Sequence, residues 1–168
     1  LTSHFWPPFY LGQRQKEKIV LVTHTETFSE RWGRRARNIV ASEQFRSIFV
    51  FGLAPDQQAA ARWETERGGE FFGIGVGGTV TGHRADLALI DDPTPGREEA
   101  DSELQRARLL NAYQDDVLTR LLPGGWLIMM STTNAGPDGN SDKRVPSFFN
   151  CVCEGIQAHE RRFAGWTE

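Results

Sequence analysis

Three short runs of apolar residues predict the buried strands of a sheet. They cover residues 18–23 (KIVLVT), 85–90 (ADLALI) and 126–131 (WLIMMS). Short runs of this kind, rich in aliphatic and β-branched residues, are typical of parallel strands covered on both faces. Residues 47–51 (SIFVF) predict a further short strand, although their composition also suits an apolar patch on a loop.

Two longer segments carry apolar residues at helical spacing. The first covers residues 25–40, where Thr27 or Ser29 is available as a cap. Its apolar positions are Phe28, Trp32, Ala36, Ile39 and Val40. The second begins at a cap, Asp101 or Ser102, and ends at the Pro-Gly-Gly of residues 123–125. Its apolar positions are Leu104, Leu110, Tyr113, Val117 and Leu121.

The remaining segments are shorter or more polar. The aromatic opening of the chain predicts the tail of a helix that ends before Pro7 and Pro8, because proline interrupts helices. Residues 54–63 predict a weak helix or a polar surface turn. Residues 63–67 and 70–76 predict two edge strands joined by a glycine turn.

The order strand, helix, hairpin, strand, helix, strand indicates an α/β domain with a mostly parallel sheet. This domain covers residues 1–134, and residues 135–168 predict an irregular tail that is rich in glycine and polar residues at its start. A chain of 168 residues is long enough for one domain with a sizeable core.

Composition excludes several classes of protein. No apolar run approaches the length of a membrane span, and no basic-then-apolar leader follows Leu1, which is itself typical of an internal piece of a longer chain. The formal net charge of −3 does not indicate a nucleic-acid-binding protein. Cys151 and Cys153 are too few for a disulfide framework or a zinc site, so we interpret them as plain thiols in a reducing compartment.

Charge is nevertheless unevenly distributed. Residues 31–37 (RWGRRAR) contain four arginines, and acidic residues gather between Asp91 and Asp116. Such an arginine group is either a solvated helix face or a patch that contacts phosphates, and the sequence leaves both interpretations open.

Residues 73–78 (GIGVGG) match the G-x-G-x-x-G pattern of dinucleotide-binding folds. That pattern requires a helix to begin at its last glycine, because the pyrophosphate sits on the helix N-terminus. Here the glycines precede TVTGHR and then the apolar run at 85–90, which is the chemistry of a turn and a strand. We therefore expect no dinucleotide site.

Polar residues follow each predicted buried strand. They are the Thr-His-Thr of residues 23–25, Asp91-Asp92, and the Ser-Thr-Thr-Asn of residues 131–134. The carboxyl ends of parallel strands share one edge of a sheet, where ligands bind. Two adjacent carboxylates would be relieved of mutual repulsion by Mg²⁺ and its bound phosphates. An Asp-Asp-Pro sequence is also a common helix cap or turn start, so this reading remains open from these residues alone.

Longer strings resemble the large terminase subunit of tailed double-stranded DNA phages, in its N-terminal ATPase part. The resemblance rests on GIGVGGTVTGHRADLALIDDPTPGREEADSE and TRLLPGGWLIMMSTT, and it extends back through KIVLVTHTETFSERWGRRARNIV. It covers residues 5–134. It implies a P-loop NTPase-like sheet of the ASCE type, flanked by helices and lacking the Walker A segment.

The resemblance also implies roles for individual residues. Asp91 corresponds to the Walker B aspartate that holds Mg²⁺, and Asp92 to the catalytic carboxylate, which is usually glutamate in related motors. Thr132, Thr133 and Asn134 belong to the motif that senses the γ-phosphate and couples nucleotide state to movement.

Arg84 has two interpretations. It lies near the region where such motors supply an arginine finger, in cis or in trans. Alternatively, it forms a structural ion pair with Asp86 or with the acidic loop after Pro93.

The resemblance further implies the reaction and its partners. ATP and Mg²⁺ are the expected cofactors, and ATP hydrolysis is coupled to translocation of double-stranded DNA into the procapsid. The expected partners are double-stranded DNA, the phage portal protein, the small terminase subunit and further copies in a homo-oligomeric ring. The expected location is the cytoplasm of the bacterial host, with no membrane partner.

The chain departs from the family in two respects. No G-x-x-x-x-G-K-[ST] loop occurs in the 168 residues, so the chain resembles a fragment that begins within the helix after that loop and is expected to be inactive alone. The family's nuclease domain is also missing. Two alternatives therefore stay open: a non-catalytic remnant or interaction module, and a helicase-like ATPase, against which the REEADS string argues.

Overall fold

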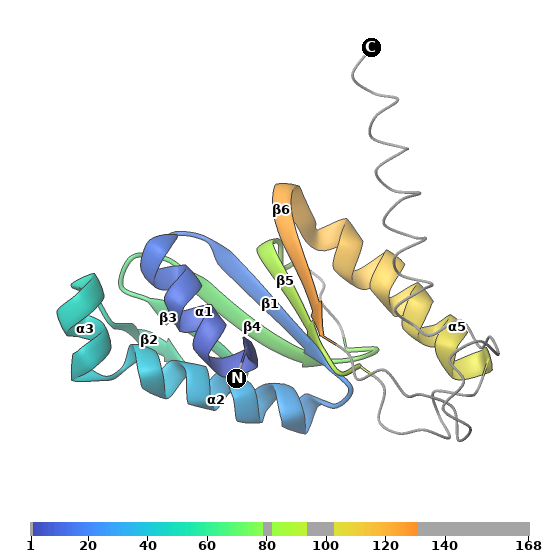
Figure 1. Ribbon diagram of the computed structural model, residues 1–168, viewed down its shortest axis with the longest axis horizontal. Coiled ribbons are helices and arrows are strands. Elements are labelled where there is room, and N and C mark those ends of the chain that lie inside the picture. The colour runs from blue at the N-terminus through green and yellow to red at the C-terminus, as the bar shows by residue number, and fades with distance from the viewer. Residues whose placement is uncertain (1, 79–81, 94–102, 131–168) are drawn as a thin grey trace, which may run out of the picture.

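The computed structural model describes residues 2–78, 82–93 and 103–130 (Figure 1). Its elements, in chain order, are α1 (Thr2–Gln13), β1 (Lys18–Thr23), α2 (Glu26–Val40), α3 (Glu43–Phe49), β2 (Leu53–Gln58), β3 (Arg62–Thr65), β4 (Glu70–Gly75), β5 (Ala85–Asp91), α5 (Glu103–Asn111), the π-helix η1 (Ala112–Val117), the 3₁₀ turn η2 (Leu118–Arg120) and β6 (Leu121–Met130). None of the described helices is long and apolar enough to cross a membrane.

The strands form one six-stranded sheet with the order β2-β3-β4-β1-β5-β6. The strands β4, β1, β5 and β6 are mutually parallel, whereas β2, β3 and β4 form an antiparallel meander. The predicted α/β class with a mostly parallel sheet is therefore confirmed.

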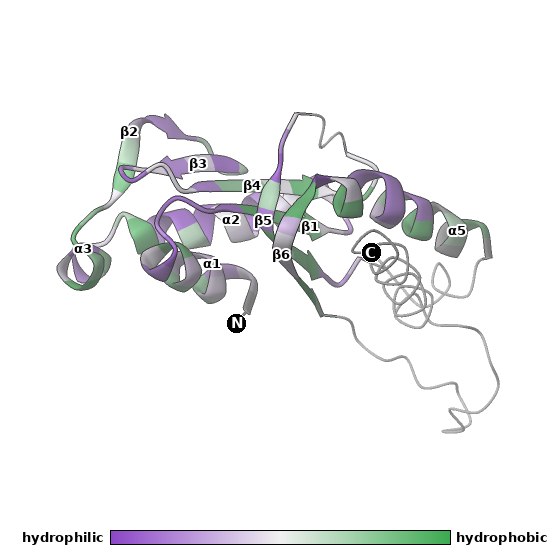
Figure 2. Ribbon diagram, turned by 90° about the horizontal axis from the view of Figure 1, so that it is seen from above, coloured by the Kyte–Doolittle hydropathy of each residue, from purple (hydrophilic) through white to green (hydrophobic). Residues whose placement is uncertain are grey.

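Helices cover both faces of the sheet, as expected for parallel strands (Figure 2). Successive residues of β1 point to opposite faces, so Ile19 and Leu21 join one core and Val20 and Val22 join the other. The first core is closed by α1, α2 and α3 and contains Leu11, Ala36, Val40 and Phe45. The second is closed by α5 and η1 through Leu109, Tyr113 and Val117.

Several predicted elements are confirmed. The strand predicted at residues 18–23 is β1, the one at 85–90 is β5, and the helix predicted at 25–40 is α2. A hairpin turn joins β3 to β4, and Gly68 has the positive φ of 86° that favours glycine. However, neither is an edge strand as predicted, because β3 lies between β2 and β4, and β4 lies between β3 and β1.

Two predictions in residues 47–63 are wrong. Residues 47–49 belong to α3, because Ser42 caps this helix by accepting the Phe45 N–H at 3.2 Å and Phe45 is buried. Residues 53–58 form β2 despite their polar sequence, because pairing with β3 requires only backbone groups. Pro55 is tolerated there because β2 is an edge strand.

The start of the chain also differs from expectation. Helix α1 runs through Pro7 and Pro8 instead of ending before them. Each proline removes one helical hydrogen bond, but both side chains are buried, so packing offsets the loss. The N-cap of α2 is Thr25, not Thr27 or Ser29, and the Thr25 side chain makes no capping hydrogen bond.

The second predicted helix is shorter and less regular than expected. It continues from α5 into the six-residue π-helix η1 and the turn η2, and β6 begins at Leu121, not at Trp126. The predicted stop at residues 123–125 lies inside β6, where the pairing with β5 shifts register between Ala85 and Leu87. The predicted caps Asp101 and Ser102 lie outside the described residues.

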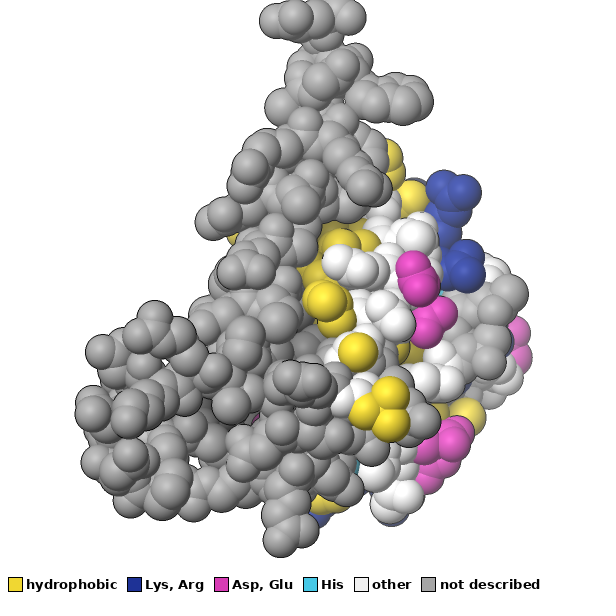
Figure 3. All heavy atoms as spheres, turned by 90° about the vertical axis from the view of Figure 1, so that its right-hand side faces the viewer, with side chains coloured by type: hydrophobic (Ala, Val, Ile, Leu, Met, Phe, Trp, Pro, Cys, Tyr) yellow, Lys and Arg dark blue, Asp and Glu magenta, His cyan; other side chains and the backbone are white. Residues whose placement is uncertain are grey.

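Strand β6 pairs with β5 alone among the described strands. Its side chains are partly or fully exposed, and Trp126 has an exposed fraction of 64%. Figure 3 views the side of the molecule that carries α5 and β6, and hydrophobic side chains gather there next to acidic and basic ones. This side of the sheet is therefore incompletely covered by the described part of the chain.

Candidate functional site

Three neighbouring strands end together at one edge of the sheet. Thr23, the last residue of β1, pairs in register with Asp91, the last residue of β5, and Asp91 pairs with Met130, the last residue of β6. Neighbouring strands lie about 4.8 Å apart, so these residues form a short row. The expected gathering of Thr23 and Asp91 is confirmed. Thr132, Thr133 and Asn134 follow β6 but lie outside the described residues.

The first turn of α1 also reaches this edge. The Ser3 hydroxyl donates a hydrogen bond to the Oδ2 carboxylate oxygen of Asp91, and Ser3 is 4% exposed. The N-terminal end of α1 therefore lies beside this carboxylate. Residue patterns did not reveal this contact, because Ser3 and Asp91 are 88 positions apart.

Asp92 occupies an uncommon backbone conformation. Its φ of 43° lies in the left-handed region, and its N–H donates to the Met130 carbonyl at 2.9 Å. A non-glycine residue in this region costs free energy and persists only where the surroundings hold it, often at functional sites. The bond to β6 thus turns the chain sharply at the position next to Asp91.

Thr23 has a structural role at this edge. Its side chain is 1% exposed, and its hydroxyl donates to the Thr25 carbonyl at 2.7 Å. Its own carbonyl accepts the Val76 N–H at 2.8 Å. These bonds fix the passage from β1 to α2 and the turn after β4, so they define the wall of the site.

The glycine-rich stretch serves close packing. A Cβ atom at Gly75 would lie 2.6 Å from the Glu26 backbone nitrogen, and one at Gly73 would lie 3.2 Å from Ser29. These glycines therefore let the start of α2 approach β4. Gly78 is not helical, and the described residues between it and β5 form a turn and irregular structure. Residues 79–81, which follow Gly78 directly, lie outside the described residues.

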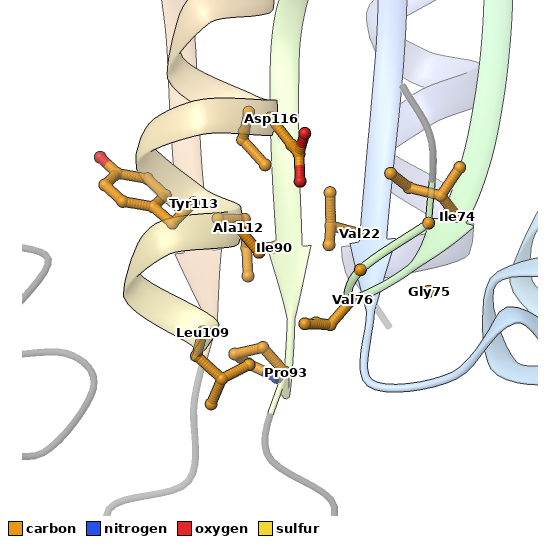
Figure 4. A pocket seen from close by; sticks show the side chains of 13 residues that line it. Val22, Ile74, Gly75, Val76, Ile90, Pro93, Leu109, Ala112, Tyr113 and Asp116 are labelled. Atoms are coloured by element: carbon orange, nitrogen blue, oxygen red, sulfur yellow. The ribbon is translucent and has the colours of Figure 1, made fainter. Parts of the chain in front are cut away.

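Two hollows flank the turn at residues 75–78. One is a gap of about 20 Å³ between the sheet and α5–η1, large enough for about one water molecule. Figure 4 shows its apolar lining, which includes Val22, Ile90 and Leu109, and the Asp116 carboxylate at one end. The other is an open groove of about 370 Å³ beside the start of α2. Neither lining includes Asp91 or Asp92.

Arg84 lies at the opposite end of β5 from Asp91. It immediately precedes the first residue of this seven-residue strand, and its side chain is exposed. A strand rises about 3.3 Å per residue, so the two Cα atoms are roughly 23 Å apart. Among the described residues Arg84 forms no ion pair with Asp86, whose carboxylate accepts the Lys18 N–H at 2.8 Å. The acidic loop lies mostly outside the described residues.

The described residues contain no group of three or more His, Cys, Asp or Glu side chains that could hold a metal ion. A protein-built cage for a metal is therefore not present in this part of the chain. The carboxylates at the sheet edge fit a different kind of metal site. In such a site, one or two carboxylates hold Mg²⁺, and water and phosphate oxygens complete its coordination. Asp91 suits this role because a hydrogen-bonded carboxylate keeps a fixed orientation.

No protein-family model matches the chain, and no curated protein is significantly similar to it.

Proposed function

We propose that this chain is the ATPase core of a DNA-packaging motor of the terminase large subunit type. The observation that carries the proposal is the placement of Asp91. It ends a buried parallel strand, lies in register between the ends of β1 and β6, and accepts a hydrogen bond from the first turn of α1. This position and this hydrogen bond suit a carboxylate that binds a phosphate-bound Mg²⁺ at a strand end.

The proposed chemistry divides the work between two adjacent residues. Asp91 holds the metal, and Ser3 keeps its carboxylate oriented. Asp92 orients and deprotonates the attacking water, and its left-handed backbone directs its side chain differently from a residue that continues the strand. When bound, Mg²⁺ would neutralise charge on the phosphates. Thr132, Thr133 and Asn134, which follow β6, are proposed to sense the γ-phosphate.

The arginine finger is proposed to act between subunits. Arg84 is separated from Asp91 by the whole length of β5, and its side chain is exposed. An arginine at that distance does not reach a nucleotide held by Asp91 of the same chain. In a homo-oligomeric ring on double-stranded DNA, it would instead face the nucleotide of a neighbouring subunit.

The first test is to read the DNA upstream of the codon for Leu1. A glycine-rich loop ending in Lys-Ser or Lys-Thr, in frame with this chain, is expected. A protein that includes such a loop should hydrolyse ATP in the presence of Mg²⁺, whereas the 168-residue chain should give only the background rate. An in-frame upstream sequence without the loop would contradict the proposal.

Two variants of the longer protein then test the division of work. Asp91→Asn should weaken Mg²⁺-dependent nucleotide binding, as measured by titration calorimetry. Asp92→Asn should leave binding nearly unchanged and lower kcat by about 10²–10⁴-fold, the usual contribution of a general base. Asp56→Asn, at an exposed position on β2, is the matched control and should change neither. Equal binding defects in the first two variants would refute the assigned roles.

A second candidate function is a non-catalytic interaction module with the same fold. It is the function expected if no G-x-x-x-x-G-K-[ST] loop belongs to the protein, because that loop supplies the main electrostatic anchor for the triphosphate. The two candidates differ in the upstream reading frame and in the Mg²⁺-dependent ATPase rate of the longer protein.

A further inference from the structure

The outward face of α1 is unusually aromatic. Phe5, Trp6 and Phe9 are exposed by 52%, 38% and 52%, although the helix contains no Lys, Arg, Asp or Glu. Surface helices normally present charged or polar residues to water, and clustered exposed apolar side chains indicate a binding surface. The inward residues of α1, such as Leu11, are already buried in the core, so the exposed rings are not needed to hold the helix.

A row of aromatic rings connects α1 to α2. His4 stacks on Trp32 with ring centroids 5.2 Å apart and planes 8° apart, and its ring lies 4.3 Å from that of Phe5. Trp6 and Phe9 form a second pair at 5.7 Å. The rings of the two helices therefore belong to one surface, which we call the α1–α2 ring surface (His4, Phe5, Trp6, Phe9 and Trp32).

Arginines border this surface, and they form no ion pair with any described residue. The guanidinium carbons of Arg31 and Arg35 lie 5.5 and 4.9 Å from the centroid of the Trp32 ring. Arg31, Arg34 and Arg35 are exposed and make no ion pair with any described residue. By contrast, Arg46 on α3 is paired with Glu66 at 2.7 Å. No acidic residue occurs in α2 after Glu30, so this end of the helix is positively charged.

We propose that the α1–α2 ring surface binds single-stranded nucleic acid. Exposed rings stack on unpaired bases, and unpaired arginines neutralise the phosphates, which is the combination found in proteins that bind single strands. A duplex would offer its phosphates to the arginines but no base faces to the rings. A second copy docked by the same surface would bring the unpaired arginines of both chains together, which is unfavourable. The proposal does not depend on nucleotide hydrolysis.

The test uses the 168-residue chain and a fluorescein-labelled oligodeoxythymidylate of roughly 16 nucleotides, the upper end of single-strand site sizes. Fluorescence anisotropy should show binding that weakens with salt and is tighter than binding to a duplex of the same length. The variant Phe5→Ala/Phe9→Ala should lose affinity on the order of tenfold or more. Ile48→Ala, an exposed apolar residue on α3, is the matched control and should bind as the parent chain does.

The arginines give a second, independent readout. Arg31→Gln/Arg35→Gln should lower the slope of log affinity against log salt by about 1.4, since each phosphate contact contributes about 0.7 for single strands. Arg67→Gln, an exposed arginine after β3, should leave the slope unchanged. Circular dichroism checks that all variants are folded. Equal affinity for the duplex, parent-like affinity of the Phe5/Phe9 variant, or no binding at low salt would each overturn the proposal.

Discussion

The two faces of the sheet are built differently. The face under α1, α2 and α3 is filled by large side chains, and Trp63 and Phe71 stack there with ring centroids 4.9 Å apart. The Trp63 indole N–H also donates to the Gly33 carbonyl at 3.1 Å, which ties β3 to α2. The face under α5 and η1 contains smaller residues, such as Ala85 and Ala88, and leaves a gap of about 20 Å³.

This difference separates a tightly packed side from a more loosely packed one. Under α1–α3, the hydrogen bond from Ser3 places the start of α1 against Asp91. On the other side, the six-residue π-helix η1 replaces regular α-helix beside the gap, and π-helical turns are rare and often occur at functional sites. The row formed by Thr23, Asp91 and Met130 lies at the boundary between these two sides.

The largest expected effect is a difference in the free energy of unfolding between Leu→Ala variants on the two faces of the sheet. Leu21→Ala, at a residue that is 0% exposed under α1–α3, should lower the free energy of unfolding by about 4–5 kcal/mol. Leu109→Ala, at a residue that is 7% exposed beside the existing gap, should cost about 2 kcal/mol, because fewer contacts are lost there. Urea denaturation of both variants measures the difference. Equal losses would show that the two faces are packed alike.

A smaller effect tests the close approach of α2 to β4. Gly75→Ala should destabilise the fold by about 1–3 kcal/mol, because its Cβ would lie 2.6 Å from the Glu26 nitrogen and 2.8 Å from the Thr25 carbonyl carbon. The comparison is Gly68→Ala, where no atom lies within 4 Å and the cost of about 1 kcal/mol arises from the positive φ. Thermal unfolding ranks the two variants, and a milder effect at Gly75 would contradict the described packing.

The smallest expected effect is on the pH dependence of stability, and it involves one histidine on each face of the sheet. Burial lowers the pKa of His4, with a smaller contribution from Arg35, and burial also lowers the pKa of His83, which stacks on Phe72. The unfolded chain then binds more protons than the folded one below about pH 6.5, so stability is present above that pH and is lost as the pH falls.

Replacement of either histidine by glutamine should therefore flatten the decline of the urea midpoint between about pH 7.5 and about pH 5. Both variants are measured against the parent chain over the same range. A parallel decline in the parent and both variants would show that carboxylates alone produce the acid sensitivity.

Elements with apolar patterns could be predicted from the sequence, and elements defined by pairing could not. Strands β1 and β5 are recognisable because burial on both faces demands an apolar run, and the register of Thr23 with Asp91 follows from their parallel direction. Strand β2 has no such run, because its pairing at the edge of the sheet uses backbone groups. The helix through Pro7 was unexpected because its stability depends on tertiary packing.

Some residues of the candidate site could likewise be predicted from the sequence, and others could not. Asp91 is recognisable from its place at the end of an apolar run, whereas Ser3 has no local signal and is identified only by the fold. Arg84 and Asp91 are far apart because they lie at opposite ends of β5. This becomes evident once the structure shows that the strand starts at Ala85.

The position of β1 in the sheet has a consequence for how the chain acquires its structure during synthesis. Strand β1 is made before its neighbours β4 and β5, and the contacts of Lys18 with Glu70 and Asp86 span 52 and 68 positions. The β3–β4 hairpin, by contrast, closes over a turn of a few residues. Loop closure over long separations is slow, so we expect the hairpin to form first and β1 to dock onto it afterwards. Until then, the apolar surface of β1 has no strand to pair with and is exposed to aggregation.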